Sequence, residues 1–196
     1  MRARYLTETE IKELCAVAPA LWLPFVVGAK TGLRIGDVLK IRPTDIYCGG
    51  VRYVAQKTGK GGKAALDGET LCALLSSAKG APWCFPSPRD PMRHLTRQAA
   101  WARVKSACRR AGVDPRGVSP HSFRKVFAVG LLHKTNIAEV QKALQHDRTD
   151  TTELYALADW ATGENAKLPL TRGDLPLLVG QILSTLGYGV DGRPKA

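Results

Sequence analysis

The feature that most constrains the fold is an apolar run at about residues 20 to 30, A-L-W-L-P-F-V-V-G-A-K. A helix that is apolar on every side must be covered on every side, so we expect this segment at the centre of the core. Pro24 falls in its first turns, where a proline is tolerated. The run from Leu21 to Ala29 is too short to cross a bilayer, which takes about 20 residues.

Further helices are predicted on both sides of this run. Thr7 and Glu10 have the spacing of a capping box, which places a first helix at about 8 to 18. A short helix is expected after Gly32, and Trp101, Val104 and Cys108 form a helical stripe that we interpret as core. The remaining predicted helices lie at about 67–78, 94–111, 119–133, 136–144, 150–158 and 174–186.

One β-hairpin is predicted between these helices. Val51–Ala55 and Ala64–Asp67 flank the glycine-rich stretch K-T-G-K-G-G-K. The basic tip is either a solvated turn or a loop laid along a nucleic-acid backbone. Its spacing differs from G-x-x-x-x-G-K-[ST], so we reject nucleotide binding. The expected fold class is therefore mainly α with a small antiparallel β-sheet, an α+β fold.

Charge narrows the class of partner. The 196 residues include 29 Lys and Arg against 17 Asp and Glu, a net charge of +12. Such an excess favours nucleic acid first and an anionic membrane surface second, although a basic soluble protein without such a partner is also consistent with it. The five cysteines are scattered without C-x-x-C spacing, which predicts a reducing cytosol and neither a disulfide framework nor a zinc site.

The stretch from Ser119 to Tyr155 gathers residues suited to phosphate chemistry. Ser119 and Pro120 have the positions of an N-cap and a first helical residue, which puts His121 and Arg124 on one face of the first turns. Helix N-termini bind anions, and a tyrosine nearby could attack a bound phosphate. Taken one at a time, a capping histidine and a core tyrosine are equally ordinary interpretations.

Four blocks of sequence together resemble the catalytic domain of the tyrosine recombinases, the phage-integrase family. They are T-G-L-R-I-G-D-V-L-K-I, the hairpin Y-V-A-Q-K-T-G-K, H-S-F-R-K-V-F-A-V-G-L-L and L-Q-H-D-R-T-D-T-T-E-L-Y. His146 and Tyr155 are nine residues apart, as is usual in that family. The resemblance covers about residues 6 to 160. It implies a catalytic domain at 1–160 and a C-terminal tail at 161–196, with a helix at about 174–186.

The resemblance also implies a site and a mechanism. Tyr155 would attack a DNA phosphodiester, leaving a 3′-phosphotyrosine bond and a 5′-hydroxyl, and strand exchange and religation would need no ATP, metal or other cofactor. Arg34 and Arg124 would hold the phosphate oxygens, and Lys57 would protonate the leaving oxygen. His121 would act as base or proton shuttle, and His146 would donate a hydrogen bond to the phosphate.

Other residues are expected to support this site. Asp37 would orient Arg34, although a structural salt bridge between these two residues would explain both without catalysis. DNA contacts are expected from Lys60, Lys63, Arg97 and Arg103. The implied partners are double-stranded DNA and further copies of the chain, as a dimer to tetramer on DNA, with no membrane. The implied location is cytoplasmic and nucleoid-associated.

The chain departs from the family pattern in three respects. Gln145 stands where glycine is usual, and Lys125 where histidine is common. The family's N-terminal core-binding domain has no counterpart before the first helix, which suggests a fragment or a minimal form. The rival functions are a type IB topoisomerase, telomere resolution by hairpin formation, and a non-catalytic DNA-binding module. The 174–186 helix would dock on a neighbouring subunit or fold back on its own domain.

Overall fold

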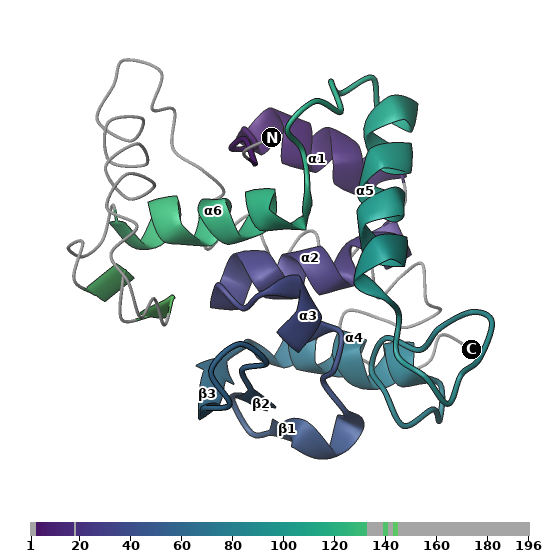
Figure 1. Ribbon diagram of the computed structural model, residues 1–196, viewed down its shortest axis with the longest axis vertical. Coiled ribbons are helices and arrows are strands. Elements are labelled where there is room, and N and C mark those ends of the chain that lie inside the picture. The colour runs from purple at the N-terminus through teal and green to yellow at the C-terminus, as the bar shows by residue number, and fades with distance from the viewer. Residues whose placement is uncertain (1–2, 18, 133–138, 141–142, 145–196) are drawn as a thin grey trace.

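The computed structural model describes residues 3–17, 19–132, 139–140 and 143–144, and a small sheet lies at one end of its group of helices (Figure 1). The elements in chain order are α1 (Glu8–Val17), α2 (Pro19–Thr31), α3 (Ile35–Val38), the 3-10 helix η1 (Pro43–Asp45), β1 (Ile46–Tyr47), β2 (Gly50–Val54), β3 (Gly61–Ala65), α4 (Gly68–Ala78), α5 (Arg97–Arg110) and α6 (Pro120–Leu132). The predicted fold class, mainly α with a small antiparallel sheet, is confirmed.

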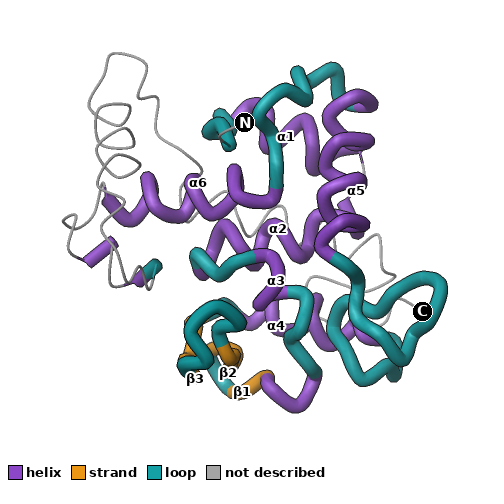
Figure 2. The backbone as a smooth tube through the Cα atoms, viewed as in Figure 1, coloured by secondary structure: helices purple, strands orange, loops and turns teal. Residues whose placement is uncertain are grey.

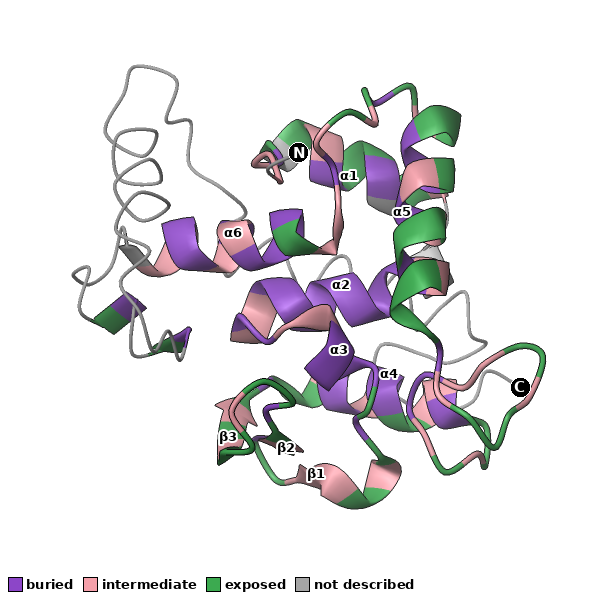
Figure 3. Cartoon of the chain, in the orientation of Figure 1, coloured by how far each residue is buried: buried purple, intermediate pink, exposed green. Residues whose placement is uncertain are grey.

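Helix α2 forms the centre of the core, as its composition predicted. Figure 3 shows most of it buried, and α6 runs alongside it in Figure 2. Their contact is aromatic: the Phe123 ring lies 5.5 Å from that of Trp22 and 5.1 Å from that of Phe25, centroid to centroid. Such tilted aromatic pairs bury large apolar areas, so this contact is a main source of stability. None of the described helices is long and apolar enough to cross a membrane.

Helix α1 begins at the predicted capping box. The Glu10 backbone N–H donates to Oγ1 of Thr7 (3.3 Å), and the Thr7 N–H donates to Oε2 of Glu10 (2.9 Å). Arg4 donates two further bonds to the same carboxylate, at 2.6 and 3.0 Å. Burial alone would raise the pKa of Glu10, but the bonds from Arg4 and Thr7 lower it below its usual value. The Arg4 backbone N–H also donates to the Gly117 carbonyl (2.8 Å), which ties the N-terminus to the loop before α6.

The predicted hairpin is present, with one extra strand and a different extent. The strands pair antiparallel in the order β1-β2-β3, and β1 was not predicted. The second hairpin strand begins at Gly61, three residues earlier than expected, so Tyr53 pairs with Gly62. A Cβ at Gly62 would lie 2.7 Å from Cζ of Tyr53, so the tyrosine ring covers the place of the missing side chain.

Helices α4 and α5 begin at side-chain caps. Asp67 accepts a bond from the Thr70 N–H, and Thr96 accepts one from the Ala99 N–H. Because Thr96 caps α5, that helix starts three residues later than predicted. Trp101 was wrongly predicted to be core: its exposed fraction is 50%, and Nζ of Lys105 lies 5.2 Å from its ring centroid.

The predicted helices at 150–158 and 174–186 lie outside the described residues, as does most of the one at 136–144. The tail at 161–196 lies outside them as well. Val140 and Leu144 are described, and they pack with Ala128 of α6 in a small second cluster.

Candidate active site

Two of the predicted arginines line one small hollow. Arg34 lies immediately before α3 in extended backbone, and Arg124 lies on α6, 90 positions along the chain. The hollow is lined by Gly32, Leu33, Arg34, Asp37, Tyr53, Arg124, Ala143 and Leu144. The fold therefore joins the first and third sequence blocks, which the sequence alone could only place on separate helices.

The guanidinium of Arg124 is buried and is held by two backbone carbonyls. Its exposed fraction is 8%; one Nη donates to the Gly32 carbonyl, and Nη2 donates to the Leu144 carbonyl at 2.6 Å. Two carbonyls from different segments fix the plane of the guanidinium. A cation held in this way is preorganised to bind an anion.

Gly32 makes this arrangement possible. It ends α2 with a φ of +69°, in the left-handed region that favours glycine. A Cβ at this position would lie 2.5 Å from Cδ1 of Phe127, so the close approach of α2 and α6 also requires glycine here. The turn delivers Arg34 to the hollow two residues later, and the Gly32 carbonyl to Arg124.

Asp37 has a different partner from the predicted one. Among the described residues no ion pair joins Asp37 to Arg34. Instead Oδ1 of the buried Asp37 carboxylate accepts the Gln56 backbone N–H at 3.0 Å. Asp37 thus links α3 to the hairpin by a hydrogen bond, and the salt bridge to Arg34 that the sequence suggested is not formed.

The lysine-rich hairpin tip is a closed turn beside this contact. The Ala55 N–H donates to the Lys60 carbonyl (2.9 Å), and the Gly59 N–H donates to the Ala55 carbonyl (2.7 Å). Lys57 and Lys60 are both exposed on this turn. Lys63 lies on β3 instead, where its Nζ is 5.6 Å from the Tyr47 ring centroid. Two lysines, rather than one, are therefore candidates for proton donation from the tip.

His121 occupies the first turn of α6, as predicted, and is exposed. Ser119 directly precedes Pro120, the first residue of α6, as predicted, and its backbone N–H donates to Oγ of Ser122 at 3.1 Å. His121 and Arg124 are one helical turn apart, the histidine exposed and the arginine buried. The predicted residues His146 and Tyr155 lie outside the described residues.

The two predicted DNA contacts on α5 have different surroundings. Arg97 is close to α3, because a Cβ added at Gly36 would lie 3.3 Å from its Cδ. Arg103 is half-buried, and this burial lowers its pKa. Arg97 is thus near the hollow, whereas the partial burial of Arg103 favours a packing role beside any contact with DNA.

Sequence reasoning missed Tyr53 and Gln56. Tyr53 lines the hollow from β2, and Nε2 of Gln56 donates to the Gly36 carbonyl at 2.7 Å. The only available signal was their position beside the lysine-rich tip.

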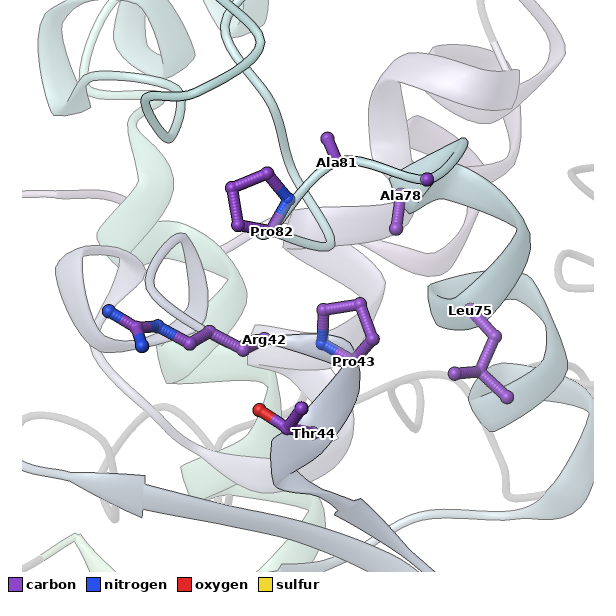
Figure 4. A pocket seen from close by; sticks show the side chains of 8 residues that line it. Arg42, Pro43, Thr44, Leu75, Ala78, Ala81 and Pro82 are labelled. Carbon is purple, nitrogen blue, oxygen red and sulfur yellow. The ribbon is translucent and has the colours of Figure 1, made fainter.

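A larger hollow of about 430 Å³ lies elsewhere, between η1 and the end of α4 (Figure 4). Arg42, Pro43 and Leu75 are among its lining residues, and none of the predicted site residues is. Size is therefore a poor guide to the site here. In the described part of the chain no cluster of three or more His, Cys, Asp or Glu side chains is arranged to hold a metal.

Comparison with known proteins gives this geometry a context. The chain is similar to the tyrosine recombinase XerD of Yersinia pestis, with 33% identity over 141 residues, 64% of this chain and 45% of the relative. It is also similar to XerD of Xanthomonas campestris pv. campestris, with 32% identity over 178 residues, 78% of this chain and 54% of the relative. The chain thus spans about half the length of these curated relatives.

Solved structures share the fold. A lambda integrase (75-356) dimer bound to a COC′ core site matches with a TM-score of 0.66 and 22% identity, over 87% of this chain and 64% of that one. XerA recombinase matches with a TM-score of 0.65 and 23% identity, over 83% and 65%. The model of the phage integrase family matches residues 4–160, which confirms the resemblance carried by the four sequence blocks. This chain therefore belongs to the phage integrase family.

Proposed function

We propose that this chain is the catalytic part of a site-specific tyrosine recombinase that cuts and rejoins double-stranded DNA. The observation that carries the proposal is the hollow that Arg34 and Arg124 share. Two guanidinium groups on one small hollow are suited to the oxygens of a phosphodiester, because each offers forked donors that carry a permanent charge. Membership of the phage integrase family supports the same chemistry.

The reaction assigns one role to each group. The Tyr155 phenolic oxygen attacks phosphorus, forming a Tyr–O–P bond while the P–O5′ bond breaks. His121 accepts the phenolic proton, and Lys57 gives a proton to the departing 5′ oxygen. The two arginines stabilise the extra charge on the non-bridging oxygens, and His146 donates a further hydrogen bond. Attack by a 5′-hydroxyl on the phosphotyrosine reverses these changes, so rejoining conserves the bond energy.

The Arg124 surroundings support its role. A guanidinium carries five N–H donors, so it can bind two backbone carbonyls and a phosphate together. The carbonyls of Gly32 and Leu144 fix its orientation before DNA arrives. A donor that is already oriented needs no reorganisation in the transition state, where its effect is greatest.

Partners are proposed on the same basis. The net charge of +12 and the exposed Lys57, Lys60 and Lys63 favour the DNA backbone. Arg97 would add a contact beside α3, and Arg103 a weaker one from α5. Among structures of similar fold are a lambda integrase dimer bound to a COC′ core site and a tetramer bound to a Holliday junction. We accordingly expect this chain to act as a dimer to tetramer on DNA, at the nucleoid of the cytoplasm.

Trapping the covalent intermediate tests the proposal. Each duplex in a library of random sequences would carry a nick shortly to the 3′ side of a possible cleavage point. Cleavage then releases a short fragment with a 5′-hydroxyl, which diffuses away and cannot religate. Protein–DNA adducts that survive denaturing electrophoresis are then sequenced to find the preferred duplex. We expect adducts with the wild type and none with Tyr155→Phe, which still binds DNA. An adduct formed by Tyr155→Phe would contradict the choice of nucleophile, and no adduct with any duplex would contradict the proposed function.

Arginine variants separate catalysis from binding. Arg34→Ala should slow cleavage of the selected duplex by about 10²–10³-fold, as expected for loss of one oriented donor at a developing charge. DNA affinity, measured by fluorescence anisotropy, should change far less. The matched control is Arg89→Ala, the same change at an exposed loop position. Equal losses of binding and cleavage in Arg34→Ala would make Arg34 a DNA contact rather than a catalytic residue.

A further inference from the structure

We propose that Gln56 is a positioning residue, which holds the lysine-bearing turn 55–60 against the segment that carries Arg34. The inference rests on the proposed function and deepens it, because it concerns the proton donor of the same reaction. The chemistry needs the arginines and the lysine to reach one phosphate from different elements. Something must therefore fix the hairpin tip relative to α3.

Two hydrogen bonds supply this link. The Gln56 backbone N–H donates to Oδ1 of Asp37 (3.0 Å), and its side-chain Nε2 donates to the Gly36 carbonyl (2.7 Å). Both acceptors belong to α3, which starts directly after Arg34. Gln56 also precedes Lys57 in the chain. The residue before the lysine is thus fixed through its backbone and its side chain at once.

The surroundings of Gly36 strengthen the link. A Cβ added there would lie 3.4 Å from Nε2 of Gln56 and 3.3 Å from Cδ of Arg97, so both side chains pack over the bare backbone of Gly36. Asp37 is 4% exposed, and its carboxylate is therefore a rigid acceptor. The turn has its own closure in the Ala55 N–H to Lys60 carbonyl bond, so it can move as one body once Gln56 is released.

Gln56 is itself exposed and is not part of the core. Truncation of an exposed side chain that makes one hydrogen bond should leave the fold intact, since such a bond contributes about 1 kcal/mol. The expected loss is in geometry, because a displacement of about 1 Å in a catalytic group can cost roughly 10²-fold in rate. Truncation of Gln56 should therefore lower the rate of cleavage with little change in the free energy of unfolding.

The test is to replace the leaving oxygen. The selected nicked duplex is made twice, once with oxygen and once with sulfur at the bridging 5′ position of the scissile phosphate. A thiol has a pKa of about 8.5, so it leaves as a thiolate without a proton donor. A fault in proton donation then disappears with sulfur, whereas a fault in phosphate binding persists. Single-turnover adduct formation by the 196-residue chain is measured on both duplexes.

The expected result is a substrate-dependent defect. Gln56→Ala should slow the oxygen duplex by about 10–100-fold and the sulfur duplex by less than about threefold. Gln56→Met, which keeps the length of the side chain without its donor, should do the same. Lys57→Ala should show this pattern more strongly, and Arg34→Ala should be slow on both duplexes. Gln98→Ala on α5, an exposed glutamine, is the matched control and should resemble the wild type.

Other results would overturn the inference or change the residue that it assigns as proton donor. Wild-type rates for both Gln56 variants would mean that the link has no role. Equal losses on the two duplexes would assign Gln56 to phosphate or DNA binding instead. Sulfur could restore the rates of Gln56→Ala and Lys60→Ala but not that of Lys57→Ala. That result would keep the positioning role of Gln56 and assign proton donation to Lys60 instead of Lys57. A wild type that forms no adduct with either duplex would refute the proposed function, and the role of Gln56 with it.

Discussion

Replacing Gly32 by alanine should disturb both stability and the arginine hollow. Gly32 has a φ of +69°, and an added Cβ would lie 2.5 and 2.6 Å from Cδ1 and Cε1 of Phe127. The obstacle is an aromatic ring on α6, which has little room because α2 and α6 are in close contact. The same residue offers its carbonyl to Arg124.

The size of the effect follows from two contributions. An L-residue in the left-handed region costs about 1–2 kcal/mol, and forcing a methyl into packed surroundings costs about 1–3 kcal/mol. Reduced freedom of the unfolded chain offsets about 0.4–1 kcal/mol. We expect Gly32→Ala to lower the free energy of unfolding by about 2–4 kcal/mol, out of about 5–15 kcal/mol for a typical domain.

Urea unfolding followed by circular dichroism measures this loss, and Gly28→Ala is the control. Gly28 lies four residues earlier, within α2, and its added Cβ would meet only the Leu33 carbonyl, at 3.8 Å. Gly28→Ala should therefore stabilise by about 0.5–1 kcal/mol. In the double variant with Phe127→Leu, much of the Gly32→Ala penalty should disappear. Equal stabilities of the two alanine variants, or additive effects with Phe127→Leu, would refute this reasoning.

Two further predictions concern stability and thiol reactivity. The pKa of Asp67 lies below its usual value because hydrogen bonds from Lys30 and Thr70 outweigh the opposing effect of burial. The Asp67 carboxylate therefore stabilises the fold at pH values above its ordinary pKa. This stabilisation is lost as the pH falls through the pKa of the folded protein. Asp67→Asn keeps a cap for α4, so its stability deficit in urea titrations should be present at pH 7, shrink as the pH falls past the ordinary pKa of about 4, and vanish only below the lower pKa of the folded protein. A deficit independent of pH would contradict this account. Burial, with a smaller contribution from Asp45, raises the pKa of Cys84 to about 12, whereas Cys48 is exposed. Iodoacetamide at pH 8 should therefore label Cys48 in the native protein and Cys84 only after unfolding. Peptide mass spectrometry would locate the labels. Rapid labelling of Cys84 in the native protein would contradict its burial.

Local signals were sufficient for most helix positions. Thr7 and Glu10 act within one turn of helix, so their spacing predicted the start of α1 correctly. The all-round apolar composition of α2 predicted its central place for a similar reason, because such a helix has no face suited to water. Trp101 shows where periodicity fails: it shares a stripe with buried residues, but the packing around α5 leaves half of it exposed.

The sequence by itself determined the family and the residues of the candidate site, because both are carried by short blocks whose spacing is readable along the chain. Only the tertiary structure decided how the blocks meet. Gly32 and Phe127 set the approach of α2 to α6, and Arg124 finds its carbonyl partners there. Asp37 takes Gln56 rather than Arg34. These contacts join residues that are distant in the chain, and they depend on angles and distances between packed elements that no local pattern records.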